Sequence, residues 1–288
     1  GHSDAENQDI FLEQAEHVLI RMNAKHWRPY LWILEARQAI AAGAYGKALE
    51  LAQLALGNFD SIGGPVSLES IEALQILASV FQAVGMRKKS LGLLLQAEQL
   101  SQSLLADQHP LRGRILVGMA SMNCFLGNCE LSRMQATGAI QILEGTLNPE
   151  HPEVAGAWIQ LGSAHSELQD YDQSLMAYHK ALSRTQASAS NPPSVEARIR
   201  TNLGLVLSRM GRLEESEVEG KQAVQLFSGH SGAEHPETAA AIGRYATVIQ
   251  KQGDVAKAEL LFEHTIKLLK KSDPLHVRIL DQVRNQAT

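Results

Sequence analysis

Residues 151–182 read HPEVAGAWIQLGSAHSELQDYDQSLMAYHKAL, and this stretch decides the fold. Apolar residues such as Trp158, Leu161 and Leu168 recur in it at helical spacing. Gln169 then marks a turn, and a second helical segment containing the small residue Ser174 follows. The stretch therefore predicts a helix, a short turn and a second helix.

The same pattern recurs along the chain with a period of 42 residues. A glycine lies five residues before the position of Ser174 in every unit except this one, where Gln169 stands. Six units in register predict an all-α solenoid of stacked helical hairpins, at about 27–64, 66–107, 108–149, 150–191, 192–233 and 234–272. Small residues fill the position of Ser174 throughout: Ala48, Ser90, Ser132, Ser174, Ser216 and Ala258.

Two further columns of small residues keep the same period. Antiparallel helices approach most closely where neither carries a bulky side chain, so small residues are expected at the crossings. A larger residue at Ser132 or Ala181 is expected to push its helix pair apart. The first column is Ala36, Ala78, Ala120, Gly162, Gly204 and Ala246, and the second is Ala55, Ala97, Ala139, Ala181, Ala223 and Thr265.

The loops between units also repeat. Proline is tolerated in the first turn of a helix, where its missing N–H costs nothing, so each such loop predicts the start of a unit's first helix. The loop pairs are His109-Pro110, His151-Pro152 and His235-Pro236, with Pro193-Ser194 in the remaining place.

The two ends differ from the repeats. Residues 1–7 begin Gly-His-Ser, which is typical of an expression-tag remnant, and we expect them to be disordered. Residues 8–26 predict an N-terminal capping helix or a half repeat, and residues 273–288 predict a C-terminal capping helix. Such caps shield the apolar faces of the outermost units.

The composition excludes several classes of function. The net charge of −5 and the pI of about 6.1 give no sign of a nucleic-acid-binding domain. The sequence contains no apolar run of about 18 residues, so no membrane-spanning helix is expected. The two cysteines, Cys124 and Cys129, indicate no disulfide framework. We expect both to pack in a helix end and turn, in a reducing compartment such as the cytoplasm.

Catalytic and metal-binding patterns are not found. The histidines of the loop pairs repeat with the period, which favours a structural role over catalysis. No His-Glu-x-x-His helix, phosphate-binding glycine loop or nucleophile elbow occurs, and the cysteines lack partners at zinc spacing. The sequence therefore predicts a protein that is not an enzyme and has no metal or cofactor.

The columns of the fourth unit resemble the tetratricopeptide repeat, and the 42-residue period with its His-Pro-Glu loops resembles the kinesin-light-chain-like subclass. The matching residues are Trp158, Leu161, Gly162, Ser174, Tyr178 and Ala181. The resemblance covers about residues 29–272. It implies a right-handed α-α superhelix whose first helices line a concave groove that holds peptides or partner segments.

One position of that groove can be followed through the repeats. Gln160, Asn202 and Arg244 are 42 residues apart, two residues before the first small column. An asparagine is common there in kinesin-light-chain-like repeats, and its amide could bond a peptide backbone. The same column is apolar or empty in the first three units, at Leu34, Ile76 and Gly118.

Further polar residues are expected nearby: Ser163, Arg198, Arg209 and Lys251. Arginines at this place would favour a carboxylate or an acidic peptide. The alternative is that they are ordinary solvated charges. Only Asn202 and Arg244 match the pattern of carboxylate-clamp repeats, two places of five, so that clamp is not expected.

The sequence thus predicts a non-catalytic scaffold that binds a partner protein or peptide, with an acidic or acceptor-rich segment, in the groove. The alternative is a sensor or regulatory domain of a larger signalling protein, in which ligand binding changes the superhelical pitch.

Overall fold

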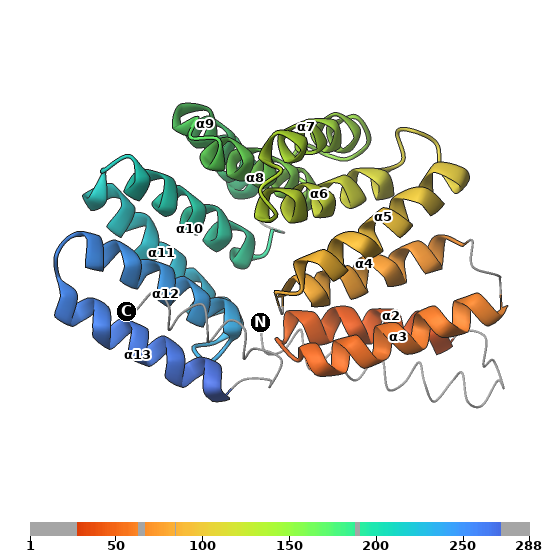
Figure 1. The fold of residues 1–288 in the computed structure, drawn as a ribbon, viewed down its shortest axis with the longest axis horizontal. Coiled ribbons are helices and arrows are strands. Elements are labelled where there is room, and N and C mark those ends of the chain that lie inside the picture. Colours follow the sequence, from red (N-terminus) through yellow and green to blue (C-terminus); the bar gives the residue numbers. More distant parts are fainter. Residues whose placement is uncertain (1–27, 63–66, 84, 188–190, 272–288) are drawn as a thin grey trace. The chain divides into compact units, whose positions relative to one another are not determined.

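The computed structural model describes residues 28–62, 67–83, 85–187 and 191–271, and every regular element in these ranges is an α-helix (Figure 1). The segments expected to form an expression-tag remnant and two capping helices lie outside the described residues. The helices are α2 (Arg28–Ala41), α3 (Tyr45–Ile62), α4 (Leu68–Ala83), α5 (Arg87–Leu104), α6 (Pro110–Phe125), α7 (Cys129–Thr146), α8 (Pro152–Glu167), α9 (Tyr171–Ala187), α10 (Pro193–Arg209), α11 (Leu213–Ser231), α12 (Pro236–Lys251) and α13 (Val255–Lys271).

Each even-numbered helix packs against the odd-numbered helix that follows it, and α3 also packs on α4, α7 on α8, α9 on α10 and α11 on α12. The chain divides between Ala106 and Asp107 into two compact units. Unit 1 contains the described helices α2–α5, and unit 2 contains α6–α13. This arrangement confirms the prediction of an all-α solenoid built from helix pairs.

The turn within each pair requires a left-handed backbone residue, and the glycines that set the sequence register provide it. Gly127 has a φ of 91°, and the N–H of Asn128 bonds the carbonyl of Asn123 at 2.8 Å, which closes the end of α6. Gln169 takes the same conformation in the fourth turn, with a φ of 63°. A side chain at this φ is strained because its Cβ crowds the backbone.

The loop histidines cap the first helices. The ring Nδ1 of His109, His151 and His235 accepts a hydrogen bond, at 3.2 Å in each case, from the backbone N–H two residues later. The following proline needs no such partner, so histidine and proline together satisfy the start of the helix. The sequence predicted the helix starts, and the structure adds the acceptor role of the imidazole.

The small columns lie where the helices of a pair touch. The serine hydroxyl of the second helix donates to a carbonyl of the first: Ser90 to Ala78 at 2.8 Å, and Ser174 to Gly162 and Ser216 to Gly204, both at 2.7 Å. The sequence suggested only steric fit at these positions. The structure shows that serine also ties the two helices together.

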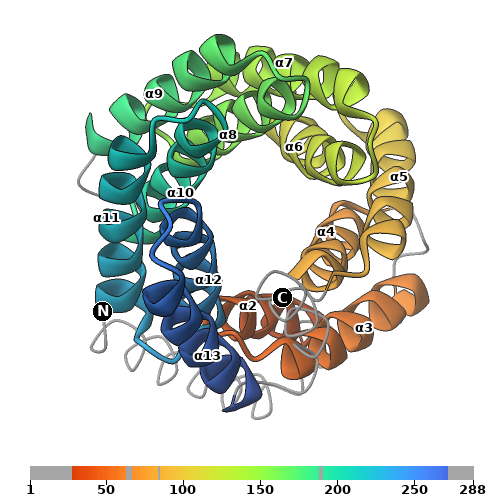
Figure 2. The same cartoon turned by 60° about the vertical axis from the view of Figure 1, so that its left-hand side comes forward.

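Apolar side chains form several buried clusters between the helices of unit 2. One buried cluster joins α8, α9 and α10 through Ile159, Tyr178 and Ile199, and another joins α12 and α13 through Ile249 and Phe262. The first helices α6, α8, α10 and α12 contact one another in succession. They lie on the inner side of the curve of this unit, and the second helices lie on its outer side (Figure 2). No helix in the described ranges is both long enough and apolar enough to span a membrane.

Candidate functional site

The predicted binding residues all lie on three neighbouring first helices of unit 2. Gln160 and Ser163 are on α8, Asn202 is on α10 and Arg244 is on α12. Because α8 contacts α10 and α10 contacts α12, the fold brings these elements together on the inner side of the unit. The remaining predicted residues are Arg198 and Arg209 on α10 and Lys251 on α12.

Gln160, Asn202 and Arg244 occupy the same position in three consecutive repeats. The first two are half-buried and Arg244 is exposed. Within the described part of the chain, none of the three side chains has a hydrogen bond or an ion pair with another residue. The same holds for Arg198 and Lys251, which are exposed. These groups therefore offer amide and guanidinium donors, and amide acceptors, to a partner.

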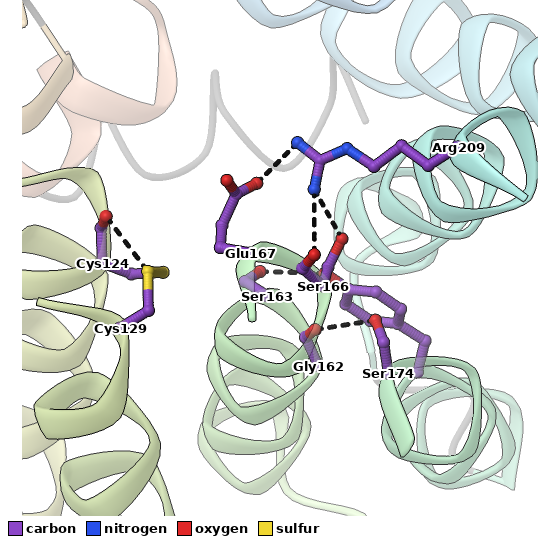
Figure 3. A network of polar contacts seen from close by, with 9 residues as sticks. Cys124, Cys129, Gly162, Ser163, Ser166, Glu167, Ser174 and Arg209 are labelled. Atoms are coloured by element: carbon purple, nitrogen blue, oxygen red, sulfur yellow. Dashed lines mark hydrogen bonds and ion pairs between the residues drawn. A yellow bond between two sulfur atoms is a disulfide. The ribbon is translucent and has the colours of Figure 1, made fainter. Parts of the chain in front are cut away.

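Arg209 is engaged by the preceding repeat. Its Nη1 donates to the carbonyl oxygen of Ser166 at 3.2 Å and to the Ser166 hydroxyl at 2.8 Å, and its Nη2 lies 2.6 Å from a carboxylate oxygen of Glu167 (Figure 3). A cation that bonds the last carbonyls of a helix stabilises that end. Arg209 thus joins the end of α10 to the end of α8.

Ser163 lies over a buried tyrosine. Its hydroxyl donates to the carbonyl of Ile159 at 3.0 Å and lies 2.9 Å from the phenol oxygen of Tyr178, a residue that is 2% exposed. Burial raises the pKa of Tyr178 to about 12, while its hydrogen bond with Ser163 and the charges of Arg209 and Arg244 act in the opposite direction. The phenol therefore stays protonated at neutral pH, and both arginines lie close enough to act on it.

Arg244 is open to solvent, yet it has much protein around it. This partial removal from water lowers the pKa of its guanidinium, and nearby Tyr178 and Glu237 act in the opposite direction. The side chain lines a crevice between α10, α11 and α12, beside Thr201 and Tyr245, whose volume of about 10 Å³ holds at most one water molecule. This crevice is therefore too small to hold a side chain of a partner.

The sequence reasoning missed the residues that hold Arg209. Glu167 and Arg209 are 42 residues apart, so they occupy one position in successive repeats with opposite charges. Stacking places equivalent positions of adjacent repeats side by side. Two opposite charges 42 residues apart could therefore have predicted the ion pair.

Cys124 and Cys129 correct another expectation, because the structure joins them by a disulfide bond (Figure 3). The prediction of two unbonded cysteines is wrong. The two residues flank the tight turn at Gly127, which reverses the chain and brings their Cα atoms to 4.2 Å.

In the described residues, no group of three or more His, Cys, Asp or Glu side chains is arranged to hold a metal ion.

Comparison with known proteins agrees with this architecture. The chain resembles a structure of kinesin light chain TPR-like repeats from Podosopora anserina, with 20% identity over 70% of this chain and 95% of the other, and a TM-score of 0.50. It also resembles NprR in complex with its cognate peptide NprX (14% identity, 99% and 83% coverage, TM-score 0.70). A third similar structure is a Rap protein complexed with competence and sporulation factor (13% identity, 98% and 83% coverage, TM-score 0.73).

No curated protein matches the chain. A family model described as tetratricopeptide repeat matches residues 111–187 and 195–271, which together make up more than half of the sequence. The chain therefore belongs to the tetratricopeptide repeat family.

Proposed function

We propose that the inner face of unit 2 binds an extended segment of a partner protein, with Gln160, Asn202 and Arg244 each contacting a successive part of it. One observation carries this proposal. The three side chains repeat on three first helices that touch one another, and none has a polar partner in the described part of the chain. Folding of the repeat does not require a hydrogen-bonding side chain at this position, since Leu34, Ile76 and Gly118 fill it in the first three repeats, so the three polar residues favour recognition.

The chemistry of the three residues indicates the class of segment. An amide both donates and accepts, as an extended peptide backbone requires. Arg244 donates to a carboxylate, and Arg198 and Lys251 add positive charge on the same helices. The proposed segment is therefore acidic or rich in acceptors. In this proposal Ser163 and Arg209 shape the floor of the site, since both are already bonded within the protein.

Two of the similar structures contain a bound peptide or factor, which supports a peptide-binding role for this fold.

We further propose that the protein is a scaffold without catalytic activity, and that it works in the cytoplasm. The disulfide weighs against this location, because disulfides persist mainly in oxidising compartments. It therefore gives the location a direct test: in the cytoplasm the two cysteines should be reduced. Trapping of thiols in intact cells, followed by mass spectrometry, would show whether Cys124 and Cys129 are reduced there.

The binding proposal is tested with labelled peptides of matched length that carry glutamate, glutamine or lysine at alternate positions. Fluorescence anisotropy should show the tightest binding for the glutamate peptide and the weakest for the lysine peptide. Loss of a charged hydrogen bond costs about 1.5–3 kcal/mol, so Arg244→Ala should weaken binding of the glutamate peptide by about 10- to 100-fold. Asn202→Ala should weaken all three peptides, because it acts on the backbone.

Lys270→Ala is the matched control, since this exposed cation lies on the second helix α13. It should leave every affinity unchanged. The proposal fails if the three peptides bind equally well, or if neither Arg244→Ala nor Asn202→Ala changes an affinity.

A further inference from the structure

The disulfide between Cys124 and Cys129 lies on a turn that the fold also builds without one. Across this turn the N–H of Asn128 bonds the carbonyl of Asn123 at 2.8 Å, and Gly127 takes the left-handed conformation. The equivalent turns of the other five repeats have the same backbone bond and a residue with positive φ. None of them has a cysteine, because the equivalent pairs are Ile40 and Tyr45, Gln82 and Arg87, Ser166 and Tyr171, Ser208 and Leu213, and Gln250 and Val255. The turn therefore needs no cross-link to fold.

The backbone of the turn brings the two positions together, so the bond can open and close without a rearrangement of the chain. The Cα atoms of Cys124 and Cys129 are 4.2 Å apart, and the residues are five positions apart in the sequence. A cross-link that closes so short a loop removes little entropy from the unfolded chain, so its reduction should cost the fold little. Two thiols held this close also meet at a high effective concentration, which favours re-formation of the bond.

The two sulfurs differ in access and in their place on a helix. Cys124 is half-buried near the end of α6, whereas Cys129 is 7% exposed, so an external thiol reaches Cys124 first. Cys129 is the first residue of α7, and in the described structure the side chain of Asn128 before it does not cap that helix. The N–H groups and the dipole of a helix start stabilise a thiolate. Because a more stable thiolate leaves faster, Cys129 suits the role of leaving group.

The same local structure also suits the reduced state. The Sγ atom of Cys129 lies 3.4 Å from the carbonyl oxygen of Cys124, so a thiol at this place can donate to that oxygen (Figure 3). The acidic neighbour Glu130 pairs with Arg133 at 2.9 Å, which offsets its repulsion of a thiolate. Both oxidation states of the pair are therefore compatible with the fold.

We propose that Cys124 and Cys129 form a redox-active pair that exchanges with a dithiol reductant. One thiolate of the reductant attacks Sγ of Cys124, the sulfur–sulfur bond breaks, and its electron pair leaves on Sγ of Cys129. The second thiolate of the reductant then attacks the reductant's own sulfur in the mixed disulfide and releases Cys124 as a thiolate. The two cysteines take up the two protons that the reductant loses, so the protein gains two thiols and the reductant becomes a disulfide. This inference does not rest on binding in the groove.

The first experiment uses the full chain with its disulfide formed, and dithiothreitol as the reductant. Labelling with N-ethylmaleimide, followed by intact mass, should show that both cysteines become reactive without denaturant. Glutathione disulfide should close the bond again once the dithiothreitol is removed. Reduction should leave the circular dichroism spectrum unchanged and lower the melting temperature by about 2–8 °C. The matched control is the double variant Cys124→Ser, Cys129→Ser, which should melt like the reduced protein.

The second experiment identifies the sulfur that is attacked. Glutathione has one thiol, so it stops at the mixed disulfide, and N-ethylmaleimide then traps the cysteine that was released. Fragmentation in a mass spectrometer should find glutathione on Cys124 and maleimide on Cys129 at least about 10-fold more often than the reverse. In the chain unfolded with urea the two products should be about equally abundant, because the fold no longer shields Cys129.

Three results would overturn the proposal. The first is a bond that dithiothreitol opens only after denaturant is added. The second is loss of the helical circular dichroism signal when the bond is reduced. The third is a folded protein in which glutathione is found on Cys129 as often as on Cys124.

Discussion

The serines at the helix crossings give the sharpest prediction, because two equivalent residues differ in one respect. Ser174 and Ser132 occupy the same position in successive repeats, and both are fully buried. The hydroxyl of Ser174 donates to the carbonyl of Gly162 at 2.7 Å. The hydroxyl of Ser132 has no hydrogen-bond partner in the described structure. Substitution by alanine should therefore lower the stability at Ser174 but not at Ser132.

The expected magnitudes follow from the bonding. A typical intramolecular hydrogen bond contributes about 1 kcal/mol to stability, so Ser174→Ala should lower the free energy of unfolding by about that amount. A buried hydroxyl without a partner keeps its desolvation cost of about 1–3 kcal/mol, so Ser132→Ala should leave stability unchanged or raise it by about 1 kcal/mol. Alanine fits the site, because Ala48 and Ala258 fill it in two other repeats.

The assay is urea denaturation followed by circular dichroism, with the two variants and the wild type at one protein concentration. A shift in the midpoint with an unchanged slope reports a change in stability. The difference between the variants should be about 1–2 kcal/mol. Equal destabilisation by both substitutions would refute the reasoning, because the column would then matter only for its small size and not for its hydrogen bonds.

Three other substitutions test separate features. Gly162→Ala should destabilise by about 1–3 kcal/mol in urea denaturation, because the new Cβ would lie 2.7 Å from Cε1 of Tyr178; Gly156→Ala on the same helix has nothing within 4 Å and should be neutral or stabilising. Gln169→Gly should raise the melting temperature, because it removes about 1 kcal/mol of left-handed strain, partly offset by added freedom of the unfolded chain. A hydrogen bond from the lysine one turn further along the helix is the main reason why the pKa of Glu217 is lowered to about 2. The ionised carboxylate therefore contributes fully to the free energy of unfolding above pH 4.5, and this contribution is lost as the pH falls towards 2. In Glu217→Gln, stability measured against pH should fall less steeply over that interval.

The sequence predicted the architecture because the structural demands of each repeat are local. The left-handed turn, the helix crossing and the helix start each favour one type of residue at a fixed position of the repeat. Gly127, Ser174 and Pro152 are examples. Because these residue types recur in successive repeats, the pattern can be recognised in the sequence. Gln169 replaces glycine in the fourth turn, yet it takes the same left-handed conformation, with a φ of 63°.

The candidate site was only partly predictable, because a free side chain and a bonded one look the same in sequence. Arg209 and Arg244 were both expected to face a partner, yet Arg209 is bonded to Ser166 and Glu167 of the preceding repeat. The disulfide between Cys124 and Cys129 was missed for a related reason, since five residues of separation say nothing of how tightly the intervening turn folds back.

The repeat also separates what folding requires from what it leaves free. Positions that pack, such as that of Ser174, hold small residues in all six repeats. The inner column is different: in unit 1 it holds Leu34, which is 44% exposed, and Ile76, which is 5% exposed and belongs to the core, whereas in unit 2 it holds Asn202 and Arg244. Packing therefore explains an apolar residue at Ile76, but it does not explain the hydrogen-bonding side chains of Asn202 and Arg244, which have no polar partner among the described residues. This difference is the reason for proposing a binding role for the inner face of unit 2.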